Sequence, residues 1–300
     1  MKKSIKKIII CGANGFTGRY LCKEFLKRNI PFTAIIRPGN NISWMKKNNI
    51  AYKFVDLNNT SELGKSIKGY EVLISVASIA FGNAPSILKA CKNENIKRVI
   101  FTSTTAIFTK LNAKSKKIRK QAENQIKNSD LNWTIIRPTM IYGNPNDRNI
   151  IKLIKWIDYF PFIPVIGSGL FLQQPIYVKD VAYTLAEIIN NKKTFRKSFN
   201  ISGKEVITFN QMIKIIKLEL KTNCLQIHLP HKIIIIILKI FESLNFKLAI
   251  KSEQIERLNE NKDFNHSKAK KVFNFNPKSF KEGVRIEIDS YKKKLNKSRR

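Results

Sequence analysis

The chain has 300 residues, 43% of them hydrophobic, which suffices for one large α/β domain or for a main domain with a smaller lobe. Its four scattered cysteines form no CxxC pair and it has three histidines, which argues against a disulfide scaffold and against a metal site. The formal net charge is +35, but 44 of the 56 basic residues are lysines distributed along the whole chain. Nucleic-acid surfaces concentrate basic side chains on one element, so this charge favours a solvated lysine surface over a nucleic-acid partner.

Short apolar runs alternate with amphipathic segments through the first half. The basic amino terminus precedes only three apolar residues before Cys11, whereas a signal peptide needs about 7–15. Strands are predicted over 7–11, 32–36, 51–55, 71–75, 98–102 and 133–137. Helices are predicted between them, over 18–28, 84–94 and 116–128. This alternation predicts an α/β fold with a parallel sheet that helices cover on both faces.

The second half is less regular and predicts a smaller lobe. A helix over 149–158 precedes a segment rich in Pro and Gly, and Asp180 is expected to cap a helix over 179–191. The apolar run 231–241 is about half of the roughly 20 residues that span a bilayer, so it predicts a buried helix, with a membrane-surface helix as the alternative. The basic tail 293–300 is expected to fray. We therefore expect a cytoplasmic protein, with weak contact to a membrane surface left open.

The segment GANGFTG, residues 12–18, lies between the first predicted strand and its helix. Gly12 allows a tight turn, Gly15 lets the backbone approach a pyrophosphate, and Gly18 lets the helix pack close to the strand. Backbone amides at the start of a helix donate to phosphate oxygens, here those of Asn14, Gly15, Phe16 and Thr17. The spacing in this context predicts a Rossmann-type, doubly wound sheet that binds a dinucleotide.

The end of the second predicted strand bears on the choice of dinucleotide. An acid there would accept from the ribose 2′-hydroxyl of NAD, but this chain has Arg37, which suits the 2′-phosphate of NADP. Arg19, just past the glycines, could assist. NADP is therefore favoured over NAD, while the alternative that Arg37 only stacks on the adenine edge stays open.

Together with the glycine turn, five further segments resemble the short-chain dehydrogenase/reductase superfamily, in its extended and atypical branches. These branches include the epimerases and dehydratases of sugar nucleotides. The segments are VDLNN (55–59), ISVAS (74–78), RVIFTSTTAIF (98–108), WTIIRPTMIYG (133–143) and QQPIYVKDVA (173–182). The resemblance extends through nearly the whole chain and implies further cofactor contacts at Asp56, Leu57, Val76, Ala77, Ser103 and Pro138. It also implies a nucleotide-binding domain over 1–145, to which part of 170–200 returns, and a partly interleaved substrate lobe over 146–292.

The family's catalytic set is a Ser or Thr with a Tyr and, four residues later, a Lys. The resemblance places Thr104 at the hydroxyl position, Ser115 at the Tyr position and Arg119 at the Lys position. The Tyr–Lys pair is therefore missing. Serine and arginine do not replace it, because serine is a poor acid or base near neutral pH and arginine stays protonated. Tyr142 is another candidate, for which a structural or substrate-lining role is favoured over a catalytic one.

Substrate contacts are implied at Arg148, Asn149 and Gln174. The planar guanidinium of Arg148 suits a diphosphate, because it can bind two oxygens at once. An architectural role is the alternative for Gln174.

Two function hypotheses follow from these residues. The first is an NAD(P)-dependent epimerase, dehydratase or reductase acting on a nucleotide sugar or similar carbonyl compound, with a homodimer left open. The second is a non-catalytic NADP(H)-binding member that acts as a redox sensor or structural subunit, as one accessory subunit of respiratory complex I does in a similar fold. The glycine turn fits both hypotheses, the substrate-lobe motifs favour the first, and the missing Tyr–Lys pair favours the second.

Overall fold

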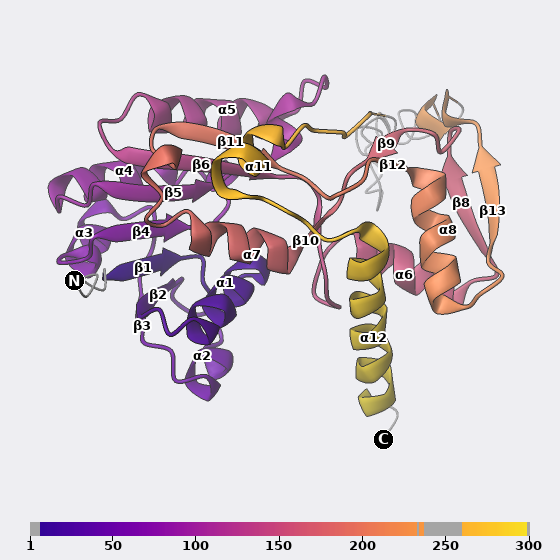
Figure 1. Cartoon of the computed structure of the whole chain (residues 1–300), viewed down its shortest axis with the longest axis horizontal. Coiled ribbons are helices and arrows are strands. Elements are labelled where there is room, and N and C mark those ends of the chain that lie inside the picture. The colour runs from indigo at the N-terminus through magenta and orange to yellow at the C-terminus, as the bar shows by residue number, and fades with distance from the viewer. Residues whose placement is uncertain (1–6, 233, 237–259, 299–300) are drawn as a thin grey trace.

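A computed structural model describes residues 7–232, 234–236 and 260–298 (Figure 1). Its larger part is built on a seven-stranded parallel sheet of order β11-β6-β5-β4-β1-β2-β3. The strands are β1 (Ile8–Cys11), β2 (Phe32–Ile36), β3 (Tyr52–Phe54), β4 (Val72–Ser75), β5 (Arg98–Thr102), β6 (Asn132–Pro138) and β11 (Lys197–Ile201). The six strands predicted from the sequence and the doubly wound α/β class are confirmed.

Helices cover both faces of this sheet because the apolar side chains of each strand point alternately to opposite sides. On one face, Ile8 and Ile10 of β1 pack in a cluster with α1 (Phe16–Lys27) and α7 (Val178–Glu187). On the other face, Ile9 and Cys11 pack in a cluster with helices α3 (Thr60–Ile67), α4 (Ala84–Asn93) and α5 (Lys114–Lys127). The short helix α2 (Ser43–Lys47) and the 3₁₀ turns η1 (Ile79–Phe81), η2 (Thr105–Phe108) and η3 (Lys192–Thr194) complete this part.

The second lobe lies beyond the carboxyl ends of the parallel strands (Figure 1). It contains three two-stranded sheets: β7 (Ile141–Tyr142) with β10 (Ile176–Tyr177), β9 (Leu172–Gln173) with β12 (Ile207–Thr208), and β8 (Phe162–Ile166) with β13 (Leu225–Leu229). In the described part of this lobe the helices are α6 (Ile150–Tyr159), α8 (Phe209–Leu220) and α12 (Phe280–Ser298), whereas α11 (Ser267–Phe273) packs against the large sheet. Thr208 and Gln211 form a capping box at the start of α8, which explains why that helix begins there.

Two local expectations are wrong. Asp180 does not cap the helix in which it lies, because α7 begins at Val178; its carboxylate instead accepts from the backbone N–H of Lys278 at 2.8 Å. The tail from residue 293 does not fray at once, since α12 continues through Ser298 and Leu295 packs against the core of the second lobe. The apolar run 231–241 lies largely outside the described residues. No helix in the described part of the chain is long and apolar enough to cross a bilayer.

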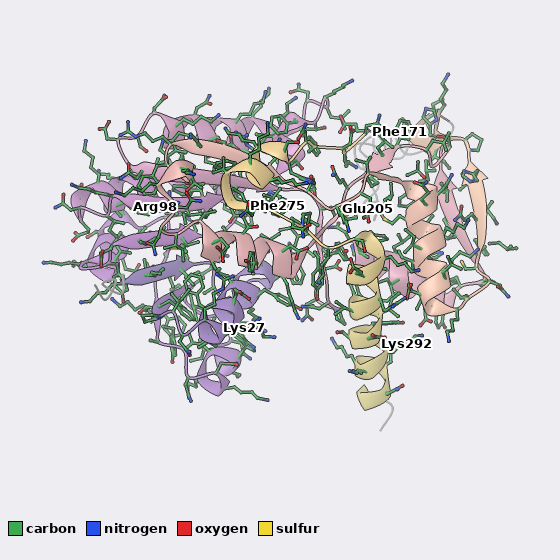
Figure 2. All side chains as sticks on the ribbon, in the orientation of Figure 1. Lys27, Arg98, Phe171, Glu205, Phe275 and Lys292 are labelled. Carbon is green, nitrogen blue, oxygen red and sulfur yellow. The ribbon has the colours of Figure 1, made fainter. Side chains whose placement is uncertain are left out.

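Arg98 is a buried cation at the end of the sheet that lies far from the second lobe (Figure 2). Its guanidinium donates to the carbonyls of Asn132, Ile188 and Ile189 and to the hydroxyls of Thr134 and Thr194, at 2.7–3.2 Å. These acceptors are all neutral, and burial lowers the pKa of Arg98 to about 9. One side chain thus ties β5 and β6 to the segment that leads from α7 to β11.

Glu287 of α12 is a fully buried carboxyl group in the second lobe. Burial and the neighbouring Asp147 raise the pKa of Glu287 to about 11. Asp147 itself accepts from the backbone N–H groups of Asn149 (2.6 Å) and Ile151, at the start of α6. We therefore assign Glu287 as protonated, and so neutral, at pH 7.

Glu287→Gln should raise the free energy of unfolding, by an amount that increases as the pH rises. The folded chain keeps a proton on Glu287 that the unfolded chain loses above its ordinary pKa, so the stability of the natural protein falls as pH rises between about 4.5 and about 11. The variant lacks this loss of stability. The difference in free energy of unfolding between the variant and the natural protein should therefore grow by up to about 1.4 kcal/mol per pH unit. Urea unfolding of both proteins at pH 5, 6.5 and 8 measures the difference; an advantage that does not change with pH would contradict a protonated Glu287.

Candidate functional site

The glycine turn between β1 and α1 is shaped by close backbone contacts. Gly12 has a φ of +77°, and a Cβ there would meet the amide nitrogen of Ala77 at 2.7 Å. A Cβ on Gly18 would overlap the carbonyl oxygen of Gly12. Gly15 differs, because its φ is −72° and a Cβ would meet only the Gly12 oxygen, at 3.2 Å. The fold therefore demands glycine at positions 12 and 18, while position 15 is left open toward solvent.

Within the described residues, the backbone N–H groups of Phe16 and Thr17 in the first turn of α1 have no protein acceptor. No side chain caps this end of the helix and no acid lies in its first turn, so the amides of Phe16 and Thr17 face outward at the positive end of the helix dipole. Of the four amides expected to donate to phosphate, that of Gly15 is used within the turn, where it donates to the Gly12 carbonyl at 3.0 Å. An uncapped helix start beside an open glycine fits a pyrophosphate group.

The loop that follows β2 is fastened to this turn. The Nδ2 of Asn14 donates to the carbonyl of Asn41 at 2.8 Å, while its Oδ1 accepts from Arg19 at 2.7 and 3.0 Å. Arg19 also lies over the ring of Trp44 at 5.4 Å, so much of its guanidinium is already engaged. Arg37 is exposed at the start of the same loop, and within the described part of the chain its guanidinium forms no hydrogen bond or ion pair.

Asp56 is exposed just after β3, where its Oδ1 accepts from the N–H of Asn58 at 3.0 Å. Leu57 beside it packs against the core under the sheet. Because β2 and β3 are neighbours, Arg37 and Asp56 follow adjacent carboxyl ends on one side of the glycine turn.

On the other side of β1, the strands β4, β5 and β6 bring further predicted residues to the carboxyl edge of the sheet. Val76 donates its N–H to the Cys11 carbonyl at 3.0 Å, which holds Val76 and Ala77 against Gly12. Ser103 follows β5 and donates its N–H to Ile136 of β6 at 2.7 Å. Thr104 caps η2 by accepting from the N–H of Ala106 at 3.2 Å. Pro138, at the end of β6, completes this set of residues. Its carbonyl accepts a hydrogen bond from the Thr105 hydroxyl at 3.4 Å.

Helix α5 presents the residues aligned with the Tyr–Lys pair. Arg119 donates to the Ser115 hydroxyl at 3.2 Å, so the two side chains form one partly buried unit. One turn further, Glu123 is buried and its carboxylate is bound by Arg137 of β6, with Nε–Oε distances of 2.8 and 3.1 Å. This ion pair lowers the pKa of Glu123 in spite of its burial. Sequence reasoning missed it, although a glutamate beside Ala122 and Ile126 on the apolar side of a helix was a signal.

A segment near the end of the chain crosses to the loop that follows β5. Glu260 accepts from the Thr109 hydroxyl at 2.5 Å and from the Lys110 N–H at 2.7 Å. The ring of Phe264 packs on that of Phe108, with 5.7 Å between centroids, and Phe108 in turn lies under the guanidinium of Arg137 at 5.3 Å. Residues 260–264 therefore pack against residues 108–110, a contact that no sequence motif indicated.

The remaining predicted residues belong to the second lobe. Tyr142 is fully buried, directs its hydroxyl to the carbonyl of Phe280 at 3.4 Å, and has a pKa raised well above its usual value by burial. Gln174 is buried too: its Nε2 donates to the Gly203 carbonyl and its Oε1 accepts from the Phe264 N–H, both at 2.8 Å. Arg148 and Asn149 are exposed at the start of α6 in the second lobe.

Comparisons with known proteins agree with the fold. A family model described as NAD(P)H-binding matches residues 12–192. The chain is 27% identical over 247 residues to the chloroplast stem-loop binding protein of 41 kDa b from Arabidopsis thaliana, covering 70% of this chain and 62% of that protein. It is 22% identical over 261 residues to N-acetyl-alpha-D-glucosaminyl-diphospho-ditrans,octacis-undecaprenol 4-epimerase from Escherichia coli O157:H7, covering 75% of each. Among solved structures it resembles UDP-glucuronic acid 4-epimerase from Bacillus cereus in complex with NAD, with a TM-score of 0.75, 19% identity and coverage of 96% and 99%.

Proposed function

Since this chain belongs to the NAD(P)H-binding family, we propose that it is an NAD(P)-dependent epimerase, dehydratase or reductase that acts on a nucleotide sugar or a similar carbonyl compound. The observation that carries the proposal is the uncapped start of α1 beside Gly15, which fits a pyrophosphate. Two further observations support it. The fold is shared with an epimerase over 96% of this chain, and a curated relative covering 75% of it is, by its name, an epimerase of a diphosphate-linked sugar.

In this proposal each element at the sheet edge has one task. The amides of Phe16 and Thr17 bind the pyrophosphate, Asp56 accepts from the adenine, and Val76, Ala77 and Pro138 enclose the ribose and nicotinamide. The bound dinucleotide would supply hydride transfer. The Thr104 hydroxyl holds the substrate oxygen, and Arg148 and Asn149 reach the substrate phosphate from the second lobe. Gln174 and Tyr142 act as supports, because their polar atoms face buried backbone groups.

Arg37→Ala should abolish a preference for NADPH over NADH. The guanidinium of Arg37 is exposed, and neither of the other charged groups at this edge, Arg19 and Asp56, replaces it: Arg19 is bound to Asn14, and Asp56 is an anion. Losing a charge-assisted contact to the 2′-phosphate costs about 1.5–3 kcal/mol, or about 10- to 150-fold in affinity. Fluorescence titration with both cofactors measures this, with Arg285→Ala, an exposed arginine on α12, as the matched control. Equal affinities of the natural chain for NADPH and NADH would refute the assignment.

Proton transfer in this site cannot use the family's tyrosine. The resemblance assigns Ser115 and Arg119 to the positions of the family's Tyr and Lys, so the proton must come from the substrate, from water or through Thr104. Positioned acid–base catalysis is worth about 10²–10⁴-fold, so turnover by the natural chain should be slow unless the reaction makes little demand on an acid.

The double variant Ser115→Tyr/Arg119→Lys should raise turnover on an accepted substrate, because it restores a phenol whose pKa a lysine can lower. Ser115→Phe/Arg119→Lys is the matched control, since it adds the ring without the hydroxyl. Absorbance at 340 nm over a panel of nucleotide sugars, with NMR of product stereochemistry, measures both. Equal rates in the two double variants would show that the added hydroxyl does not reach a substrate.

The second candidate is a non-catalytic NADP(H)-binding protein, a redox sensor or structural subunit. It is favoured by the Ser115–Arg119 unit and by a relative whose name describes a binding protein rather than an enzyme. Cofactor binding without turnover on any substrate of the panel, in the natural chain and in Ser115→Tyr/Arg119→Lys alike, would select this candidate.

A further inference from the structure

The outer end of the second lobe presents exposed apolar side chains from three elements. β8 and β13 are paired in parallel register, so Phe162 lies beside Leu225 and Pro164 beside Ile227 on one face. The side chains of the opposite face of β8, Ile163 and Val165, are buried in the core of the lobe. The face that carries Phe162 and Leu225 is therefore the outer one.

Helix α6 extends this surface with aromatic side chains. Trp156 donates its indole N–H to the Phe162 carbonyl at 2.9 Å, and its ring packs on Phe160 with 4.7 Å between centroids. Tyr159 packs against the same ring of Phe160 at 4.9 Å. We name as the apolar face the six exposed residues Trp156, Tyr159, Phe160, Phe162, Leu225 and Ile227. β8 and β13 lie at the end of the molecule opposite the seven-stranded sheet (Figure 1).

Basic side chains border the aromatic part of this face. Lys152 and Lys155 are exposed on α6, on the same side of the helix as Trp156 and Tyr159, at spacings of three and four residues. Lys221 is exposed shortly before β13. The acid on this part of α6, Asp158, accepts from the Tyr291 hydroxyl at 2.9 Å. Aromatic and aliphatic side chains bordered by lysines are typical of a surface that inserts into a lipid headgroup region.

Three partners could cover such a face: a second copy of this chain, RNA or a lipid surface. The charge and the side-chain chemistry of the face favour one of them. A second copy of this chain would bring together two molecules with a formal net charge of +35 each, which repel one another. RNA has the complementary charge, and its bases can stack on the aromatic rings of this face, but the aliphatic side chains of Leu225 and Ile227 offer no ring for stacking. An anionic lipid surface satisfies both features, because its headgroups attract the lysines and its hydrocarbon accepts the aliphatic side chains.

We propose that the apolar face docks this protein on the surface of an anionic lipid bilayer. The contact is peripheral: Tyr159 and Leu225 enter the headgroup region and Lys152 and Lys155 meet the phosphates. It does not depend on the function proposed above, since none of these residues lies at the carboxyl edge of the large sheet.

The test is co-sedimentation of the full chain with vesicles of phosphatidylcholine alone or with 30 mol% phosphatidylglycerol. The test variant is Tyr159→Ser/Leu225→Ser, at side chains that are 82% and 67% exposed and so contribute little to folding. The matched control is Phe54→Ser/Phe81→Ser, which removes exposed rings from the nucleotide-binding part. We expect the natural chain and the control to bind anionic vesicles within about twofold of each other, and the test variant about tenfold more weakly.

A second readout locates the contact. Brominated lipids in the anionic vesicles should quench the fluorescence of Trp156, and Trp156→Phe, which retains Trp44 and Trp133, should lose that quenching. Equal binding by test and control variants, or quenching unchanged in Trp156→Phe, would overturn the proposal. A concentration-dependent dimer that only the test variant disrupts would assign the face to a second copy, and loss of RNA affinity alone would assign it to RNA. A lowered melting temperature with unchanged vesicle binding would show that another part of the chain covers the face.

Discussion

A chain that carries Gly15→Val is expected to fold normally and to bind NADPH at least about 100-fold more weakly than the natural chain. Position 15 has an ordinary φ of −72°, and an added Cβ meets only the Gly12 carbonyl oxygen, at 3.2 Å. The valine side chain would instead project into the space beside the first amides of α1, where the pyrophosphate is proposed to lie. Calorimetric titration with NADPH measures the loss, and circular dichroism and thermal unfolding report on the fold.

Gly18→Val is the informative counterpart. A Cβ at position 18 would overlap the backbone oxygen of Gly12 and the Cα of Ala13, so this variant should lose stability as well as affinity. Although the two glycines are three residues apart in one motif, Gly15→Val should lower only the NADPH affinity, whereas Gly18→Val should lower both the affinity and the stability. Unchanged NADPH affinity in a folded Gly15→Val protein would mean that the turn serves another ligand.

Arg98→Met is expected to destabilise the fold by about 3–5 kcal/mol, the largest effect on stability that we predict. The substitution keeps most of the side-chain volume but leaves five buried acceptors on β6, the end of α7 and η3 without their common donor. It also removes the guanidinium from the ring of Phe195, which lies at 4.6 Å. Because these contacts lie at the amino-terminal ends of the strands, cofactor affinity measured on the folded fraction should stay unchanged.

Arg196→Met provides the control for this prediction. Arg196 is exposed in the same connection and donates one hydrogen bond, to the carbonyl of Asp130 at 2.9 Å. Its loss should cost less than about 1 kcal/mol. Urea unfolding of both variants gives the comparison, and equal costs would show that the five contacts of Arg98 contribute little.

The parts of this structure that follow from local pattern could be predicted from the sequence. Buried strands such as Ile8–Cys11 and Val72–Ser75 are continuous apolar runs, because a parallel sheet buries both of its faces. The glycine turn was recognisable because Gly12 and Gly18 are required by backbone geometry within a few residues of the chain. Arg37 could be singled out because it follows the second predicted strand, whereas Asp56 was implied only by the family resemblance.

Features that depend on contacts distant in sequence could not be predicted. The Glu123–Arg137 ion pair joins a helix to a strand, and the bond from Thr109 to Glu260 spans 151 residues. The resemblance implied a substrate contact for Gln174, and nothing local indicates that the backbone at 203 and 264 occupies its amide. Burial of Tyr142 follows from the close approach of α12, where a Cβ on Gly283 would overlap its hydroxyl.

The position of NADPH in a crystal structure of the natural chain would test these assignments together. We expect the pyrophosphate at the amides of Phe16 and Thr17, the 2′-phosphate within hydrogen-bond distance of Arg37, and the nicotinamide beside Thr104 and Pro138. A dinucleotide bound elsewhere, or one whose 2′-phosphate lies away from Arg37 and whose nicotinamide lies away from Thr104, would contradict them.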